Sequence, residues 1–390
     1  MSKFSKIHER RNSNSIKWDN MSEIYNISDT SSILPMWIAD MDFPAPPALA
    51  DAINERLKHP VFGYTFPNDE VKKAITDWYE VRHQWKIDPS TILFQQGVVP
   101  AIATIIETFT KVGDKIGMST PAYPPFFNVP IAQQREIVTA DLTEKDGSYT
   151  FDFNVLGELF QSGIKLYILC NPHNPAGIVW SHDDLEKLIQ LCIQYDVYLL
   201  ADEIHADILI TKNYTPALTV NGAEQAKIIS CIAPTKTFNI AGIHAAMIVA
   251  PNEELFNALN LTGQAHGQLS LNIFACAAVK AVYTEGAQWL DELLSYLKVN
   301  MQYVSDELNA MDGIRVVIPE ATYLMWIDYR GTGLSEQDMM QLLLSKGQLA
   351  LDPGTKYGEA GRGFLRINVA CPLDTLKDGI ARFKHALQSQ

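Results

Sequence analysis

The sequence predicts an α/β fold, with a mostly parallel central sheet in a large domain and a smaller α+β domain. Three observations lead to this prediction. From about residue 90 to 250, short β-rich runs alternate with runs of helical period, a pattern typical of a parallel sheet. The length of 390 residues exceeds what one hydrophobic core usually supports. After Glu285, a long helical pattern begins and is followed by further short apolar runs.

The large domain contains a clear strand-helix-strand unit. Apolar runs at 165–170 and 197–201 predict two strands, and a third is predicted at 227–232. Between the first two, Ser181 opens a segment that resembles a capping box. Four apolar residues then recur at the i, i+3, i+4, i+7 spacing of one helix face, namely Leu185, Leu188, Ile189 and Cys192. We therefore predict a helix between the two strands.

The smaller domain is predicted from the C-terminal pattern. Its long helix carries Trp289, Leu293 and Leu297 on one face. Apolar runs at 314–318 and 323–327 come next, and a last helix is predicted over 373–387.

The domain boundaries are inferred from these patterns, since no low-complexity linker marks them. The proline-rich segment 35–47 is expected to pack with the C-terminal part. We therefore predict a large domain over 48–285 and a small domain made of 1–47 and 286–390.

Composition argues against several kinds of partner. The chain has 45 acidic and 31 basic residues, a formal net charge of −14, which opposes binding to nucleic acid or anionic membrane. The five cysteines are widely spaced, and no CxxC or His-x-x-x-His spacing suggests a metal site. No run approaches the roughly 20 apolar residues of a membrane span. We expect a cytoplasmic protein without a metal.

Unusual polar residues come directly after all three predicted strands of the large domain. The segments are 171–177 (Asn-Pro-His-Asn-Pro-Ala-Gly), 202–205 (Asp-Glu-Ile-His) and 233–239 (Ala-Pro-Thr-Lys-Thr-Phe-Asn). Each alone has an ordinary explanation as a turn, a helix cap or a solvated lysine. In open α/β sheets, however, ligands bind beyond the C-terminal ends of the strands. The joint occurrence of an amide, a carboxylate and a lysine there favours a binding site.

The chain resembles fold-type I pyridoxal-phosphate enzymes of the class I/II aminotransferase group, above all the MalY/PatB-type carbon-sulfur β-lyases, which are cystathionine β-lyase-like. The resemblance covers nearly the whole length and is carried by four runs: 15–19 (Ser-Ile-Lys-Trp-Asp), 36–43 (Met-Trp-Ile-Ala-Asp-Met-Asp-Phe), 170–175 and 352–358 (Asp-Pro-Gly-Thr-Lys-Tyr-Gly). It implies the PLP-dependent transferase fold, which is aspartate aminotransferase-like, with pyridoxal 5′-phosphate bound by the large domain.

The resemblance implies catalytic roles for three residues. Lys236 matches the Schiff-base lysine, whose amine also removes the proton from the substrate Cα. Asp202 matches the carboxylate that pairs with the pyridine nitrogen. Tyr123 matches the aromatic residue that stacks on the pyridine ring, although a tyrosine of the apolar core is the competing interpretation.

The remaining cofactor contacts are also implied by the resemblance. Asn174 would donate to the 3′-oxygen, and His205 would lie near it, unless it is a core histidine satisfied by the backbone. The phosphate would be held by Gly97, Val98 and Thr235, at a glycine turn that opens an apolar helix. Tyr64 would reach the phosphate from the neighbouring subunit, so a homodimer is expected.

Arg366 matches the arginine that grips the substrate α-carboxylate, assisted by Asn174 and Ala39. It lies among apolar residues, where a buried cation requires an anionic partner.

Two positions depart from the aminotransferase pattern. His244 stands where many aminotransferases carry a phosphate-binding arginine, and Ala233 stands where they often carry serine. Both departures fit the lyase branch better. No motif indicates a second arginine for a dicarboxylate substrate.

The expected activity is therefore β-elimination of cysteine S-conjugates such as cystathionine, which gives a thiol, pyruvate and ammonia. An aminotransferase is the alternative, because both reactions begin by removing the same Cα proton. An additional regulatory role in binding a protein partner ranks below both.

Overall fold

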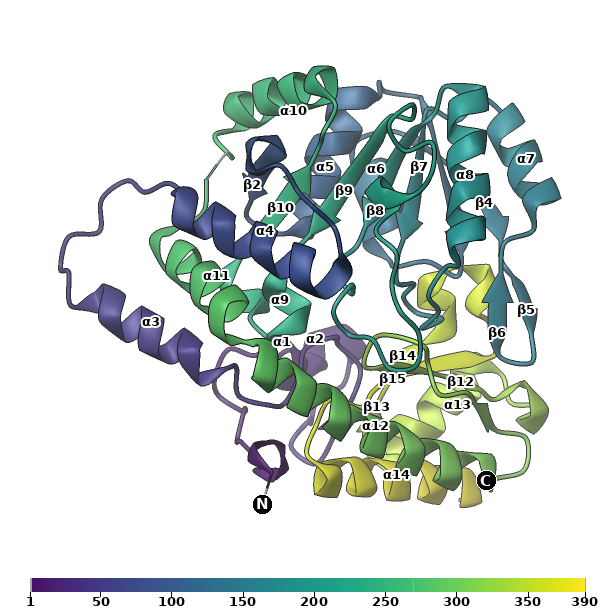
Figure 1. Ribbon diagram of the computed structural model, residues 1–390. Coiled ribbons are helices and arrows are strands. Elements are labelled where there is room, and N and C mark those ends of the chain that lie inside the picture. Colours follow the sequence, from purple (N-terminus) through teal and green to yellow (C-terminus); the bar gives the residue numbers. More distant parts are fainter. Residues whose placement is uncertain (1, 269, 390) are drawn as a thin grey trace.

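The computed structural model describes residues 2–268 and 270–389, and a seven-stranded sheet lies at its centre (Figure 1). The strand order is β2-β10-β9-β8-β7-β3-β4. Strand β10 runs antiparallel to both of its neighbours, and the other pairings are parallel, so the predicted mostly parallel sheet is confirmed. The strands are β2 (Ile92–Gln95), β3 (Lys115–Thr120), β4 (Glu136–Asp141), β7 (Leu166–Cys170), β8 (Tyr198–Asp202), β9 (Ile228–Ile232) and β10 (Ala246–Val249).

Helices cover both faces of this sheet, because alternate residues of the buried strands pack in opposite directions. Leu199 packs in a cluster with Leu188 of α8, whereas the adjacent Leu200 packs with Ile102 of α5. The helices before and around the sheet are α3 (Pro47–Leu57), α4 (Asp69–His83), α5 (Val98–Phe109), α6 (Pro125–Ala132), α7 (Phe153–Gln161), α8 (His182–Tyr195), α9 (Pro234–Thr237), α10 (Glu253–His266) and α11 (Ile273–Glu285).

A second sheet, with the order β11-β12-β15-β14, is antiparallel throughout. Its strands are β11 (Arg315–Val316), β12 (Leu324–Asp328), β14 (Asp352–Pro353) and β15 (Phe364–Asn368). The helices α12 (Ala287–Asn309) and α14 (Leu373–Gln388) lie side by side next to it in Figure 1, and α13 (Glu336–Leu342) comes after β12. Strands β5 (Thr143–Lys145) and β6 (Ser148–Thr150) form a separate hairpin.

The N-terminal segment joins this C-terminal region. It contains α1 (Ile16–Asp19), α2 (Met21–Tyr25) and β1 (Leu34–Pro35), and β1 pairs in parallel with β13 (Leu349–Ala350). The backbone of Met36 continues the contact, since its N–H donates to Ala350 and its carbonyl accepts from Asn368. The expected packing of the proline-rich segment is thus confirmed, while the domain boundaries stay predictions.

The predicted elements agree with the structure apart from their ends. The three predicted strands of the large sheet each begin one residue later, and β8 also includes Asp202. The predicted helix begins after Ser181, whose Oγ accepts from the backbone N–H of Asp184 at 3.1 Å. Within the apolar run 314–318, only Arg315 and Val316 form a strand, which pairs with β12. None of the helices in the described ranges combines the length and the apolar character needed to cross a membrane.

Candidate active site

A cavity of about 330 Å³ lies at the C-terminal ends of β7, β8 and β9. These strands are parallel neighbours in register, with Cys170 beside Asp202 and Asp202 beside Cys231, so the segments at their ends converge. Most of the sequence-predicted site residues line the cavity: Ala39, Gly97, Val98, Tyr123, Asn174, Asp202, His205, Thr235 and Lys236. His244, which stands in place of the phosphate-binding arginine, lines it as well.

Lys236 lies on the short helix α9, directly after β9. Its Nζ donates to the carbonyl oxygen of Ala39 at 2.5 Å. Burial and the nearby charge of Arg366 lower the pKa of Lys236 to about 8, although Asp40 and Asp202 act in the opposite direction. At pH 7 about a tenth of the amine is therefore neutral, which is far more than for an ordinary lysine, and the neutral form is the one that a nucleophile or base requires.

Asp202 ends β8 and is fully buried without a cation. No residue in the described part of the chain forms an ion pair with it, and the backbone N–H of Ile204 donates to its Oδ1 at 3.2 Å. Burial raises the pKa of Asp202 to about 7, and the charge of Glu203 adds to this effect. A buried carboxylate without a counter-charge is costly by itself, so this position suits a ligand that brings a positive group.

Asn174 and Arg366 lie against one another. Asn174 accepts a hydrogen bond from Arg366 Nη1 through its Oδ1 at 3.0 Å, and no described residue accepts from its amide nitrogen, which is left as a donor at the cavity. Arg366 Nη2 donates to the carbonyl of Trp37 at 3.0 Å, and Arg366 Nε has no partner within residues 2–268 and 270–389. The unused donors of Arg366 suit an added carboxylate.

The anionic partner that sequence reasoning requires for Arg366 comes from the protein itself. Asp352 Oδ2 lies 2.7 Å from Arg366 Nη2, and the two residues are register partners on β14 and β15. Asp352 is also bonded by Lys356 and Tyr357. It lies in the run 352–358, which carries part of the family resemblance, but only the antiparallel pairing of β14 and β15 identifies it as a site residue.

His205 and Tyr123 are both uncharged in this environment. Burial, with the charges of Lys236 and Arg366, lowers the pKa of His205 to about 3. Its Nδ1 finds no partner among the described residues, unlike a core histidine satisfied by the backbone. Burial raises the pKa of Tyr123 to about 12, and its ring contacts that of Phe126 edge-on. Tyr123 thus also contributes to the apolar core.

A helix N-terminus opens at the other side of the cavity. Gly97 caps α5 with a φ of +133°, a backbone conformation that favours glycine, and Val98 begins the helix. Thr235 and the exposed His244 line the same cavity. The free N–H groups of a helix N-terminus are suited to bind a phosphate.

Tyr64 does not line this cavity. It lies in the connection between α3 and α4, which extends outward from the rest of the chain in Figure 1, and its side chain is fully exposed, at 112% of the reference area. A site in this chain therefore cannot receive its own Tyr64 in this arrangement.

The residues present fit pyridoxal 5′-phosphate. The cavity combines a lysine amine of lowered pKa, a buried carboxylate without a cation, a free amide donor and a helix N-terminus. These groups match an aldehyde, a protonated ring nitrogen, a phenolic oxygen and a phosphate, respectively.

Comparisons with known proteins agree with this fit. The family described as aminotransferase class I and II matches residues 33–383. The cystathionine beta-lyase PatB of Bacillus subtilis is 41% identical over 98% of this chain and 99% of its own length. A PLP-bound putative aminotransferase from Clostridium difficile (TM-score 0.95, 37% identity) covers 98% of this chain and 99% of its own. A PLP-bound C-S lyase from Staphylococcus hominis (TM-score 0.91, 30% identity) covers 99% and 98%.

Proposed function

This chain belongs to the aminotransferase class I and II family, and from that premise we propose that it is a pyridoxal-phosphate-dependent carbon-sulfur β-lyase. The observation that carries the proposal is that one cavity contains both the Lys236 amine and Asp202, a buried carboxylate that forms no ion pair within the described residues. The lyase branch is supported by the relatives named cystathionine beta-lyase and C-S lyase.

Pyridoxal phosphate, when bound, acts as an electron sink that acidifies the Cα–H of an amino acid. Lys236 supplies the amine that binds it and, once the substrate amine takes that place, removes the Cα proton. The lowered pKa of Lys236 keeps enough of the amine neutral for this proton transfer. Because Nζ is bonded to the Ala39 carbonyl, the amine starts from a defined position.

The other residues bind the cofactor and the substrate and orient them. Asp202 keeps the ring nitrogen protonated, which in turn favours the ionised form of Asp202. Arg366, held from the opposite side by Asp352 and Asn174, binds the substrate carboxylate through its remaining donors. Gly97, Val98 and Thr235 bind the phosphate. Loss of a thiolate from Cβ after proton removal, and then hydrolysis, gives a thiol, pyruvate and ammonia.

An aminotransferase remains the second candidate, supported by the solved putative aminotransferase at 37% identity. Lys236 and Asp202 would serve it equally, since both reactions share the Cα proton removal. After that shared step, a lyase would lose a group from Cβ, whereas in an aminotransferase Lys236 would deliver the proton to a different atom. A location in the cytoplasm and a regulatory partner stay predictions.

A homodimer is part of the proposal, with Tyr64 completing the phosphate site of the partner. Four exposed apolar residues lie near it in the sequence: Leu57 ends α3, and Val61, Phe62 and Phe66 lie in the connection between α3 and α4. Helix α3 itself buries none of its residues in the single chain. An apolar surface of this kind is typical of an interface between subunits.

A product assay on the purified protein tests the proposal. With L-cystathionine and no added oxo acid, we expect a free thiol and pyruvate in equal amounts. Borohydride reduction and subsequent peptide mass analysis should find the reduced cofactor on Lys236. A strict requirement for an added oxo acid would support the aminotransferase instead, and a protein that binds no cofactor would overturn both.

A further inference from the structure

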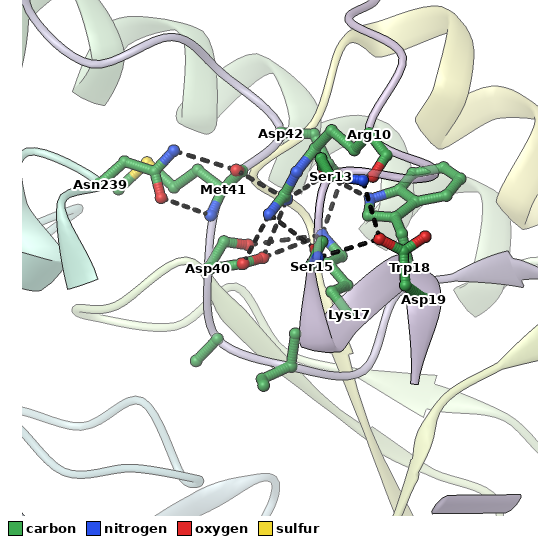
Figure 2. Close-up of polar contacts among 12 residues, drawn as sticks. Arg10, Ser13, Ser15, Lys17, Trp18, Asp19, Asp40, Met41, Asp42 and Asn239 are labelled. Carbon is green, nitrogen blue, oxygen red and sulfur yellow. Dashed lines mark hydrogen bonds and ion pairs between the residues drawn. The ribbon is translucent and has the colours of Figure 1, made fainter. Parts of the chain in front are cut away.

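A cluster of buried and partly buried charges close to the cavity has no role in the proposed mechanism. It consists of Arg10, Lys17 and Trp18, which contact Asp40 and Asp42, and we call these five residues the N-terminal clasp (Figure 2). Four of the five residues lie in the runs 15–19 and 36–43, which carry the family resemblance. No role for any of these four is predicted from the sequence.

The charges in the clasp are fully compensated. Asp42 accepts from Lys17 Nζ at 2.7 Å, Arg10 Nη1 at 2.7 Å and Trp18 Nε1 at 3.0 Å, while Arg10 Nη2 binds Asp40 at 2.8 Å. Lys17 is only 1% exposed. Burial alone would raise the pKa of Asp42, but Lys17 and Arg10 outweigh it and keep that pKa below its usual value.

The segment 39–43, which carries both carboxylates, is also held from the side of Lys236. Asn239, three residues after Lys236, accepts from the N–H of Met41 at 2.9 Å and donates to the carbonyls of Met41 and Phe43 at 3.0 and 2.8 Å. Figure 2 shows Asn239 on one side of this segment and Arg10 on the other. Arg10 also donates to the Met41 carbonyl, at 3.2 Å.

The same segment carries the hydrogen-bond acceptor of Lys236. Ala39 directly precedes Asp40, and its carbonyl accepts from both Lys236 Nζ at 2.5 Å and Tyr323 Oη at 2.9 Å. The N–H of Asp40 donates to the Ile38 carbonyl at 3.0 Å, which makes Ala39 the tip of a tight turn. The carbonyl that holds the amine thus lies one residue from Asp40 and three from Asp42.

We propose that the N-terminal clasp positions the Ala39 carbonyl against Lys236, which makes Lys17 and Arg10 positioning residues for the amine of the active site. The proposal rests on the proposed function of Lys236. Removal of one partner of a buried ion pair leaves an uncompensated charge that draws the segment toward water. Because Asp42 and Ala39 share this short segment, such a movement withdraws the carbonyl from the amine.

The direction of a change in the Lys236 pKa separates this role from a purely electrostatic one. The groups that face Lys236 from other elements are Asp202, His205, Arg366, Tyr323 and Asp40. Loss of a clasp cation with the segment still in place strengthens the field of Asp40 and raises the Lys236 pKa. Withdrawal of the Ala39 carbonyl and of Asp40, with Lys236 still buried, removes two groups that favour the ammonium form, so that pKa falls.

Lys17→Met removes the charge and keeps the side-chain length. We expect the Lys236 pKa to fall by about one unit, a tenfold change in the protonation equilibrium. It is measured on the full chain, freed of cofactor and shown to reload, as the pH dependence of acetylation at Lys236 detected by peptide mass analysis. Lys17→Arg, which keeps the positive charge, should leave the Lys236 pKa at its value in the unaltered protein. Leu297→Ala, a cavity variant in the core of α12, is the control that loses stability without a change in this pKa.

An unchanged or raised Lys236 pKa in Lys17→Met overturns the proposal. Should this variant fail to fold, Arg10→Met gives the same test, since Arg10 is partly exposed but binds both carboxylates. The proposed function fails separately: if borohydride leaves no reduced cofactor on Lys236 of the unaltered protein, the lysine does not hold the cofactor, whatever the clasp variants do to its pKa.

Discussion

The N-terminal clasp and the end of the central sheet each bury a lysine and an aspartate, yet they treat them in opposite ways. In the clasp, Lys17 and Asp42 form an ion pair at 2.7 Å, and the pKa of Asp42 is lowered. At the sheet end, Asp202 forms no ion pair with any described residue, its pKa is raised to about 7, and the pKa of Lys236 is lowered to about 8. The same residue types thus serve structure where they are paired and remain available for a ligand where they are not.

The largest effect is expected for Lys236→Ala. The variant loses both the amine that holds the cofactor and the base that removes the Cα proton, so kcat/KM for L-cystathionine should fall by at least about 10³-fold. The borohydride adduct should disappear as well. Lys384→Met, which breaks the ion pair with Glu307 between α14 and α12, should retain normal activity. Pyruvate release by the Lys236→Ala variant at a rate near that of the unaltered protein would remove Lys236 from the mechanism.

The two aspartates should respond oppositely to replacement by asparagine in the cofactor-free protein. At pH 8, Asp42→Asn removes the carboxylate that Lys17 and Arg10 share and leaves the buried Lys17 only the more distant Asp40 at 3.8 Å, which should cost about 3–5 kcal/mol of unfolding free energy. Asp202→Asn removes an uncompensated charge and should instead stabilise the protein by roughly 2–4 kcal/mol. Urea denaturation measures both changes.

The pH dependence of the Asp202 effect has a defined sign. The pKa of this carboxyl is about 7 in the folded chain against an ordinary value of 3.8, so folding favours the protonated form. This contribution is fully present below about pH 4 and is lost as the pH rises through 7. The gain from Asp202→Asn should therefore grow between these pH values. A gain that does not change with pH would mean that Asp202 is ionised throughout.

A smaller effect is expected at Arg366, which forms an ion pair with Asp352 and, in the proposed mechanism, also binds the substrate carboxylate. Arg366→Lys keeps a cation beside Asp352 but loses the fork that reaches Asn174 and the Trp37 carbonyl. The KM for L-cystathionine should rise by about 10–100-fold, with a smaller change in kcat, because the α-carboxylate loses a directional partner. Steady-state kinetics separate the two constants, and an unchanged KM would place the carboxylate elsewhere.

The smallest effect is expected for His205→Phe. Because the pKa of His205 is about 3, the ring is already neutral at every pH where the enzyme is assayed. Activity should fall by less than about tenfold, and both limbs of the pH profile of kcat/KM between about pH 5 and 9 should keep their positions. A limb that moves in this variant would show that His205 titrates in the working enzyme.

Much of this organisation could be predicted from the sequence, because it depends on local signals. The strands that precede Asn174, Asp202 and Lys236 are short apolar runs with polar ends, and parallel strands bring such ends together. The start of α8 is likewise predictable from Ser181, whose capping bond is made to a residue three positions away.

The features that could not be predicted depend on contacts between distant residues. Lys17 looks like an ordinary exposed lysine in a short helix, and only its contact with Asp42, 25 residues away, explains its burial. Asp352 reaches Arg366 through the pairing of β14 with β15. The role of Ala39 toward a substrate carboxylate stays a prediction, and the contact of its carbonyl with Lys236, 197 residues later, was not predicted.

The pairing of β1 with β13 has a consequence for the order of events during synthesis. Leu34 pairs with Leu349, Tyr25 Oη donates to the carbonyl of Leu351, and the carbonyl of Met36 accepts from Asn368. The segment that holds the Lys236 amine is therefore held in part by residues that leave the ribosome long after it. The central sheet can form while the chain is still being translated, but the contacts that this segment makes with residues 349–368 form only after those later residues have emerged.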